Sequence, residues 1–242
     1  MTHIEPELLE RVNAWLTPAF DKETQDQIKE TIALNPEGLK ESFYKDLEFG
    51  TGGMRGVMGI GTNRINKYTL GRSTQGLSEY MLNYFPDETP KVAIAYDCRH
   101  KSKTLAKVVA DVFSANGIEV FLFEDLRPTP EMSFVIRELR CQSGIILTAS
   151  HNPKEYNGYK AYWEDGSQIV GPHDVNIIEE VQKVKAEDIK FEGNRELIEI
   201  IGEEMDKKFL AKVKTVSISP DVVARHKDLK IVYTPIHGTG VK

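Results

Sequence analysis

The chain has 242 residues, of which 40% are hydrophobic and 28% charged, so it is long enough to bury a core and to hold more than one domain. Its net charge of −6 argues against a general nucleic-acid-binding role, because that role favours a basic surface. Two cysteines make no disulfide framework, the N-terminal segment is acidic where a signal peptide is basic, and no apolar run approaches membrane length. These features predict a cytoplasmic protein with no nucleic-acid and no membrane partner.

Residues 1–46 are predicted to form a helical N-terminal extension. Apolar residues recur at helical spacing from Leu8 to Leu16 and again from Ile28 to Leu39, and Pro18 separates the two runs. We expect these helices to pack on the main body as a structural collar.

A glycine-rich segment follows, with six glycines between Gly50 and Gly61. This is too many for a helix and suits a backbone that approaches another group closely. Within the segment, Arg55 offers a planar fork of donors for a phosphate, although a set of structural turns is the alternative. The pattern is neither a nucleotide P-loop nor a dinucleotide-binding turn.

Strands and helices are predicted to alternate through the next hundred residues. The predicted helices cover 68–84, 102–116 and 131–140, and the predicted strands cover 92–96, 119–123 and 144–149. Such alternation is typical of an α/β domain with helices on both faces of its sheet. A hairpin signal at Asp165-Gly166, between 159–163 and 168–170, predicts a mixed rather than a purely parallel sheet.

The remaining sequence predicts the end of this domain and the opening of another. Pro172 opens a helix, 195–216 has the pattern of one long amphipathic helix, 221–228 that of a linker or short helix, and 229–234 that of a strand. A strand with no helix behind it makes a poor domain end. We therefore expect three parts: the extension (1–46), a three-layer α/β/α domain with a mixed sheet (47–216), and the beginning of a second domain (217–242).

The candidate chemistry centres on Ser150, in the segment Gly144–Pro153. An apolar strand leads into a polar elbow, where Asn152 is pushed out of the α region and Pro153 excludes a regular continuation. The hydroxyl of Ser150 is therefore expected to be exposed at the carboxyl end of a strand, where open α/β sheets hold their ligands. A serine in that place suits the uptake and return of a phosphoryl group.

His151 follows Ser150 directly, and a catalytic pair of the two is disfavoured because adjacent residues of an extended elbow point in different directions. The Gly-x-Ser-x-Gly signature of the α/β-hydrolases is absent, which disfavours a serine hydrolase. A phosphoryl relay is the interpretation left, with His151 contacting phosphate or a sugar oxygen.

Lys160 follows an Asn157-Gly158 pair, which predicts a turn that folds the next strand back past the serine. So placed, Lys160 could contact the phosphate or act as a general acid or base, and a solvent-facing lysine is the alternative.

Asp97, Arg99 and His100 follow a strand end at the same edge of the sheet, and we expect a structural Asp97–Arg99 ion pair ahead of a direct catalytic role. Three other histidines, His3, His173 and His226, show no partner in the sequence and are expected at the surface.

The hexapeptide Thr148-Ala149-Ser150-His151-Asn152-Pro153 resembles the phosphoserine loop of the α-D-phosphohexomutases, the phosphoglucomutase/phosphomannomutase superfamily. Other segments fall where that family has them: Thr51–Gly56, Tyr96–Arg99, Pro128–Pro130 and Asn157–Lys160. The N-terminal helices together with Leu47–Gly53 resemble the longer subgroup that includes bacterial phosphoglucomutases and phosphopentomutases.

The resemblance implies a mutase that moves a phosphoryl group between the 1 and 6 (or 5) positions of a sugar phosphate through a phosphoserine and a bisphosphorylated sugar. Ser150 matches the serine, Lys160 the acid/base candidate, Arg55 the stabilising arginine, and His151 the histidine beside the serine. Asn152, Arg99 and His100 are expected with them among the phosphate-binding residues. The subgroup favours glucose 1-phosphate as substrate, with glucose 1,6-bisphosphate as activator.

The resemblance also implies Mg²⁺, held by a phosphoserine oxygen and by aspartates of an Asp-Gly-Asp-x-Asp-Arg loop. That loop does not occur in this sequence, nor do the family's sugar-specificity and second phosphate-binding loops. We therefore expect an N-terminal fragment, inactive or nearly so alone, in which Ser150 is the metal contact and the remaining domains of the same polypeptide are the partners.

A non-catalytic phosphate-binding or regulatory module with the same fold is the alternative function. Both functions predict anion binding at the elbow, but only the mutase predicts that Ser150 accepts phosphate from a glucose bisphosphate. The joint presence of Ser150, His151, Lys160 and Arg55 favours the enzyme.

Overall fold

A mixed six-stranded sheet forms the centre of the molecule. The computed structural model describes residues 5–236 and 238–240. The strand order is β1-β5-β4-β2-β3-β6, in which β2, β3, β4 and β6 are parallel and β5 runs antiparallel to both of its neighbours. The strands are β1 (Gly53–Val57), β2 (Lys91–Tyr96), β3 (Glu119–Phe123), β4 (Ser143–Leu147), β5 (Tyr156–Trp163) and β6 (Ile198–Ile201). The sheet is therefore mixed, as predicted.

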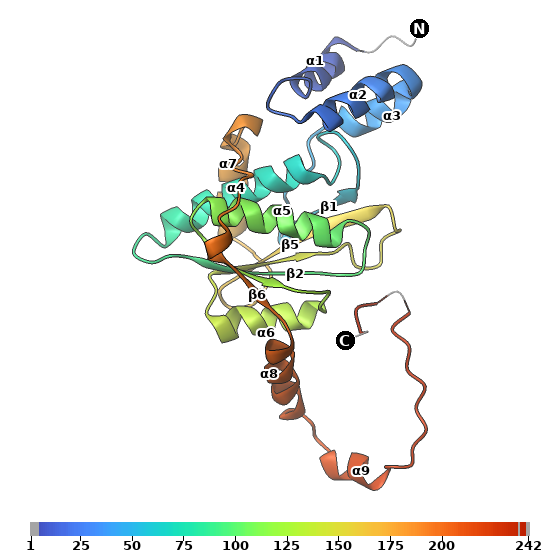
Figure 1. The fold of residues 1–242 in the computed structure, drawn as a ribbon, viewed down its shortest axis with the longest axis vertical. Coiled ribbons are helices and arrows are strands. Elements are labelled where there is room, and N and C mark those ends of the chain that lie inside the picture. The colour runs from blue at the N-terminus through green and yellow to red at the C-terminus, as the bar shows by residue number, and fades with distance from the viewer. Residues whose placement is uncertain (1–4, 237, 241–242) are drawn as a thin grey trace.

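Helices cover both faces of the sheet and make the predicted three layers (Figure 1). One face carries α4 (Lys67–Tyr84), α5 (Ser102–Ala115) and α7 (His173–Lys183), and the other carries α6 (Thr129–Leu139) and α8 (Glu203–Lys214). Strand β2 shows why both faces are filled: Val92 and Ile94 enter the core under α4 and α5, whereas Ala93 and Ala95 enter the core under α6. Strands buried on both faces are nearly all apolar, which made this part of the sheet predictable.

The N-terminal extension consists of α1 (Pro6–Ala14), α2 (Lys22–Leu34) and α3 (Pro36–Phe43), as the helical periodicity predicted. Side chains cap the last two helices, because Asp21 accepts a hydrogen bond from the Thr24 N–H and Asn35 accepts one from the Gly38 N–H. The extension attaches to the sheet domain through aromatic packing of Trp15 on Tyr68, whose ring centroids lie 5.5 Å apart.

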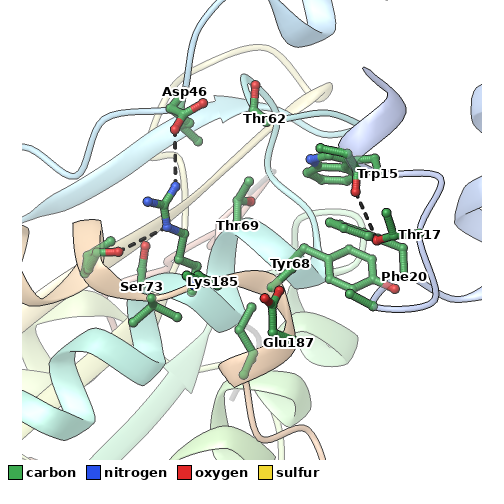
Figure 2. A pocket seen from close by; sticks show the side chains of 18 residues that line it. Trp15, Thr17, Phe20, Asp46, Thr62, Tyr68, Thr69, Ser73, Lys185 and Glu187 are labelled. Atoms are coloured by element: carbon green, nitrogen blue, oxygen red, sulfur yellow. Dashed lines mark hydrogen bonds and ion pairs between the residues drawn. The ribbon is translucent and has the colours of Figure 1, made fainter. Parts of the chain in front are cut away.

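A cavity of about 350 Å³ lies between this extension and the helices α4 and α7. Figure 2 shows Trp15, Phe20 and Tyr68 together on one side of the cavity and Asp46 on the other. Arg72 donates to a carboxylate oxygen of Asp46 at 3.2 Å and to the backbone oxygen of Val181 at 3.1 Å. Asp46 also forms an ion pair with Arg11, so it joins the extension to α4.

Two elements differ from the sequence predictions because pairing between distant strands decides them. Residues 195–216 are not one helix: Arg195–Leu197 form a 3₁₀ turn, Ile198–Ile201 form β6, and α8 begins after Gly202. The edge of β3 supplies hydrogen-bond partners for β6, which a helix could not use. Strand β1 lies inside the glycine-rich segment, where no strand was predicted, because it pairs with β5.

The C-terminal region also differs from its prediction. The short helix α9 (Pro220–Arg225) forms as expected, but residues 229–234 form no strand. Ile231 is 76% exposed and Val232 97% exposed, so no described neighbour offers this segment a pairing edge. The second arm of the predicted hairpin contributes only a single bridge, between Tyr162 and Gln168. The division at 46/47 and 216/217 stays a prediction.

Among the described helices, none combines the length and the apolar character that a membrane span requires.

Candidate active site

Ser150 is exposed just beyond the carboxyl end of β4, as its sequence context predicted. Its φ of +53° lies in the left-handed region, and the Asn152 N–H donates to the backbone oxygen of Ala149 at 3.1 Å. A tight turn therefore follows the buried residues Thr148 and Ala149 and presents the serine hydroxyl at the sheet edge.

The backbone N–H of Ser150 is held from inside the protein. It donates to the Thr148 hydroxyl at 3.0 Å, and this hydroxyl donates in turn to a carboxylate oxygen of Asp97 at 2.6 Å. Arg99 approaches the same carboxylate oxygen, with 3.5 Å between its Nε and Asp97 Oδ2. The predicted structural ion pair between Asp97 and Arg99 is therefore confirmed.

His151 lies closer to Ser150 than the sequence indicated. Its Nδ1 is 3.3 Å from the serine Oγ, and both side chains are exposed. The prediction that the two side chains point apart was wrong. The left-handed conformation of Ser150 replaces an extended elbow by a turn, and the turn brings the two groups onto one side.

Lys160 and Arg55 face a common cavity of about 250 Å³ at the edge of the sheet. Lys160 pairs with Gly53 across the β1–β5 ladder, so Arg55, two residues further along β1, lies on the same face of the sheet. Neither cation forms a hydrogen bond or an ion pair with another described residue. Two such cations beside one cavity are suited to an anion.

Strand pairing, not the predicted turn, places Lys160. Asn157 and Gly158 lie inside β5, and the chain reverses earlier, where the Tyr156 N–H donates to the backbone oxygen of Pro153 at 3.0 Å. A Cβ on Gly158 would lie 2.7 Å from the backbone oxygen of Thr148, which explains a glycine inside this strand. The turn predicted at Asn157-Gly158 was therefore wrong.

A second cavity, of about 260 Å³, opens beside Ser150. Its lining includes Asp97, Cys98, Arg127, Thr129, Thr148, Ser150, His151 and Thr239. Thr148 lines both cavities, so the Ser150–His151 pair and the Arg55–Lys160 pair line two cavities that share this residue. The cavity between the N-terminal extension and α4 shares no lining residue with either of them.

The other predicted phosphate-binding residues lie near this site but face neither cavity. The side chains of Asn152, His100 and Arg99 are absent from both linings. The backbone oxygen of His100 accepts a hydrogen bond from Asn157 Nδ2 at 3.0 Å, and Arg99 donates to backbone oxygens of the serine loop.

Arg127 is a residue of the site that the sequence did not reveal. Its side chain is only 2% exposed and forms part of the Ser150 cavity. Asp206, from α8, accepts two hydrogen bonds from this guanidinium. Only the adjoining Pro128–Pro130 motif drew attention to this region, because a pair 79 residues apart leaves no local pattern.

Glu131 extends this polar group into the core under α6. Its side chain is 3% exposed, and burial, together with a hydrogen bond to Asp206, raises the pKa of Glu131 to about 7. A protonated Glu131 can share its proton with Asp206, which leaves one negative charge of the pair to face Arg127.

His173 was wrongly predicted to lie without a partner at the surface. Its ring stacks on Trp163 with 4.3 Å between centroids, and its Nδ1 is 2.8 Å from the Tyr80 hydroxyl. His226 is exposed, as predicted, and His3 lies outside the described residues.

The described residues provide no complete metal site. No group of three or more His, Cys, Asp or Glu side chains among them is arranged to hold a metal ion. Asp97, the carboxylate beside Ser150, already accepts hydrogen bonds from Thr148 and Ser102. The donor set at this edge therefore fits a metal only if the oxygens of a phosphorylated Ser150 supply this chain's ligand.

Comparison with known proteins identifies the family. Residues 46–188 match the family model described as phosphoglucomutase/phosphomannomutase, alpha/beta/alpha domain I. A human phosphopentomutase is 34% identical over 239 residues, which cover 93% of this chain and 39% of that protein. A phosphoglucomutase of Staphylococcus haemolyticus is 34% identical over 207 residues, which cover 84% of this chain and 37% of that protein.

A solved structure shares the fold. The open form of the Paramecium phosphoglucomutase parafusin superposes with a TM-score of 0.62 at 19% identity, covering 81% of this chain and 40% of that one. The chain thus spans about two fifths of the length of the relatives that it matches. On these grounds the chain belongs to the phosphoglucomutase/phosphomannomutase family, and residues 46–188 are its α/β/α domain I.

Proposed function

We propose that this chain supplies the phosphoserine of a phosphosugar mutase. The observation that carries the proposal is the exposed Ser150 hydroxyl at the carboxyl end of β4, together with two cations, Arg55 and Lys160, in a cavity that shares Thr148 with the Ser150 cavity. The side chains of both cations have no partner among the described residues. Positioning and charge neutralisation supply most of the acceleration in phosphoryl transfer, and this edge of the sheet offers both.

The proposed step exchanges one P–O bond for another. The bond between phosphorus and Ser150 Oγ breaks while a hydroxyl oxygen of the sugar monophosphate bonds to phosphorus. The hydroxyl gives up its proton, and the departing serine oxygen gains one. The bisphosphorylated sugar then turns over within the site, and its other phosphoryl group returns to Ser150 by the reverse exchange.

Lys160 is the acid/base candidate in this proposal, because its ammonium faces the cavity that Arg55 also lines. His151 is the second acid/base candidate for the serine oxygen, since its Nδ1 lies 3.3 Å from Oγ. Arg55 is proposed to stabilise the charge of the phosphoryl group. Asn152, in the serine loop, and His100, which follows β2, line neither cavity, and we propose that they contact the substrate phosphate outside these cavities.

The rest of the site is proposed to come from further domains of the same polypeptide, in keeping with the two fifths of its relatives that the chain spans. Residues 217–242 would begin the second domain. We propose that Mg²⁺ binds to a phosphoryl oxygen of Ser150 and to aspartates of that domain, where it would neutralise phosphate charge. The whole protein would act in the cytoplasm.

Glucose 1-phosphate is the proposed substrate, and glucose 1,6-bisphosphate the proposed activator. The proposal rests on the likeness of Leu47–Gly53 and the N-terminal helices to the longer subgroup. A phosphopentomutase and a phosphoglucomutase are both 34% identical to this chain, so sequence identity does not separate hexose from pentose.

The test compares variants of the full-length protein that contains this chain, with glucose 1-phosphate and a pentose 1-phosphate as substrates. Ser150→Ala should abolish turnover, and Arg55→Gln and Lys160→Gln should each lower kcat by about 10²–10³-fold. Lys154→Gln is the matched control, because Lys154 is exposed in the same loop and lines neither cavity. Activity that survives Ser150→Ala would contradict the proposal. Phosphate binding at this edge without any turnover would favour the non-catalytic module.

A further inference from the structure

The guanidinium group of Arg99 donates hydrogen bonds to backbone oxygens along the serine loop. Its Nη2 donates to the backbone oxygens of Ser150 at 2.7 Å and Asn152 at 2.6 Å. Its Nη1 donates to those of Pro153 at 2.9 Å and Tyr156 at 3.0 Å. Four carbonyl groups of one loop therefore meet the four N–H bonds of the two terminal nitrogens.

The remaining donors of Arg99 face Asp97. The Nε is 3.5 Å from one carboxylate oxygen, and the backbone N–H of Arg99 donates to the other at 3.0 Å. The N–H bonds of both terminal nitrogens are therefore occupied, and the Nε faces the Asp97 carboxylate, so the guanidinium is directed at the loop and at Asp97. This distinguishes Arg99 from Arg55, whose side chain forms no hydrogen bond or ion pair with a described residue.

Asp97 completes the support from the amino side of Ser150. Through the Thr148 hydroxyl it fixes the Ser150 N–H, while Arg99 fixes the Ser150 carbonyl. Both ends of the serine residue are thus tied to residues 97–99, which follow the neighbouring strand β2. Ser102 holds the carboxylate in place by donating to it at 3.0 Å.

Ser150 needs this support because it is a non-glycine residue at a φ of +53°. L-residues avoid that region, so the conformation persists only where the surroundings impose it. A lysine could not replace Arg99, because a single ammonium cannot reach carbonyls spread over four residues in the way that a planar fork does.

We propose that Arg99 is a positioning residue: it holds Ser150 in its outward, left-handed conformation through the loop carbonyls, and it does not itself bind the substrate phosphate. The conformational part of this inference rests on the contacts alone. Its consequence for phosphoryl transfer rests on the proposed function.

The test compares Arg99→Lys and Arg99→Gln with the control Arg64→Gln. Arg64 also donates from a terminal nitrogen to two backbone oxygens, those of Glu41 and Asn63, each at 3.0 Å, and neither acceptor belongs to the serine loop. The first readout is hydrogen exchange of the loop amides that are hydrogen-bonded in the structure, Ser150, Asn152 and Tyr156. The second is the affinity for inorganic phosphate. The third is the single-turnover rate of Ser150 phosphorylation by glucose 1,6-bisphosphate in the full-length protein.

Both Arg99 variants should speed exchange of the three amides by about tenfold or more, because each loses charged hydrogen bonds to the loop. Phosphorylation should slow by a similar or larger factor, with phosphate affinity unchanged and no rescue by lysine. Arg64→Gln should change none of the three readouts. If an Arg99 variant fails to fold, Thr148→Val provides the test, because it removes the acceptor of the Ser150 N–H and leaves the bonds of Arg99 to the loop carbonyls in place. Exchange should then rise at Ser150 alone, and faster exchange at Asn152 and Tyr156 as well would contradict the inference.

Unchanged loop exchange with weaker phosphate binding, restored by Arg99→Lys, would overturn the inference and make Arg99 a phosphate ligand. A wild-type protein whose Ser150 is never phosphorylated would defeat the proposed function instead. Loop exchange in the variants would still decide whether Arg99 positions Ser150.

Discussion

The carboxylate of Asp206 meets the guanidinium of Arg127 with both oxygens, 2.6 Å from Nε and 2.8 Å from Nη2. The two residues join α8 to the loop in front of α6, and Arg127 also lines the cavity beside Ser150. Hydrogen bonding to Asp206 raises the pKa of Arg127 against the opposing effect of burial, so the guanidinium stays charged. The pair therefore links the position of α8 to that of Arg127 in the cavity beside Ser150.

Replacing Arg127 by methionine should lower the free energy of unfolding by about 3 kcal/mol. The change leaves Asp206 and the buried Glu131 without their cation, and an uncompensated buried charge is costly. Urea denaturation would measure the effect. Lys208→Gln is the control on α8, because Lys208 pairs with Glu138 at the surface and should contribute less than about 1 kcal/mol. Equal stabilities of the two variants would contradict a structural role for the Arg127–Asp206 pair.

Glu131 should make the stability of the protein depend on pH. Its pKa rises from 4.5 to about 7 on folding, so the folded state binds the proton more tightly than the unfolded state. The resulting stabilisation is complete below pH 4.5 and declines as the pH rises towards 7, above which it is lost.

Glu131→Gln should flatten this dependence, because an uncharged amide can still donate to Asp206. Between pH 5 and pH 8, the free energy of unfolding of the variant should rise relative to that of the wild type by on the order of 2 kcal/mol. Chemical denaturation at a series of pH values would check this, with Glu138→Gln as a control on the same helix. Parallel stability curves for wild type and Glu131→Gln would show that Glu131 does not titrate in this range.

Gly158→Ala should destabilise the protein by about 1–3 kcal/mol and disturb the serine loop. The added Cβ would lie 2.7 Å from the Thr148 oxygen and 2.8 Å from the Met54 oxygen. Met54 lies in β1 and Thr148 directly follows β4, so neither backbone group can move independently of the sheet. Thermal unfolding and hydrogen exchange at Ser150 would report the two effects. Gly50→Ala is the matched control, because its nearest atom would be 3.8 Å away. Similar losses in both variants would indicate a general cost of replacing loop glycines instead.

Trp15→Ala should lower the free energy of unfolding by about 3–5 kcal/mol and weaken the packing of the N-terminal extension on the sheet domain. The Trp15 ring is 6% exposed and packs on Phe20, Phe43 and Tyr68, so truncation leaves a large cavity. Limited proteolysis should then cut within residues 5–45 before the sheet domain. Trp163, the other tryptophan, reports unfolding of the sheet domain by fluorescence. Leu34→Ala is the control, since Leu34 is 76% exposed, and an equally large effect there would contradict the role of Trp15.

Much of the fold could be predicted because local patterns agree with the tertiary structure. The strands that became β2, β3 and β4 are short apolar runs buried on both faces, and α5 ends just before Gly117, as its sequence indicated. The elbow at Ser150 was predictable for a similar reason, because Pro153 stops the strand pattern within a few residues.

Most of the incorrect or missed predictions depend on residues far apart in the sequence, and the one about His151 depends on a local backbone conformation. Strand β1 lies in a glycine-rich segment and forms because it pairs with β5. Strand β6 forms because it pairs with the edge of β3. The pair Arg127–Asp206 spans 79 residues, and the contact between Ser150 and His151 depends on a single positive φ. None of these has a sequence signal within a window of a few turns.

Peptide mapping by mass spectrometry shows whether Ser150 carries the phosphoryl group. The full-length protein would be incubated with glucose 1,6-bisphosphate and Mg²⁺, and its intact mass and the Ser150 peptide measured before and after addition of glucose 1-phosphate. We expect one phosphoryl group on the Ser150 peptide, which glucose 1-phosphate then removes. A folded full-length protein whose Ser150 stays unmodified throughout would rule out the phosphoserine and leave a phosphate-binding module.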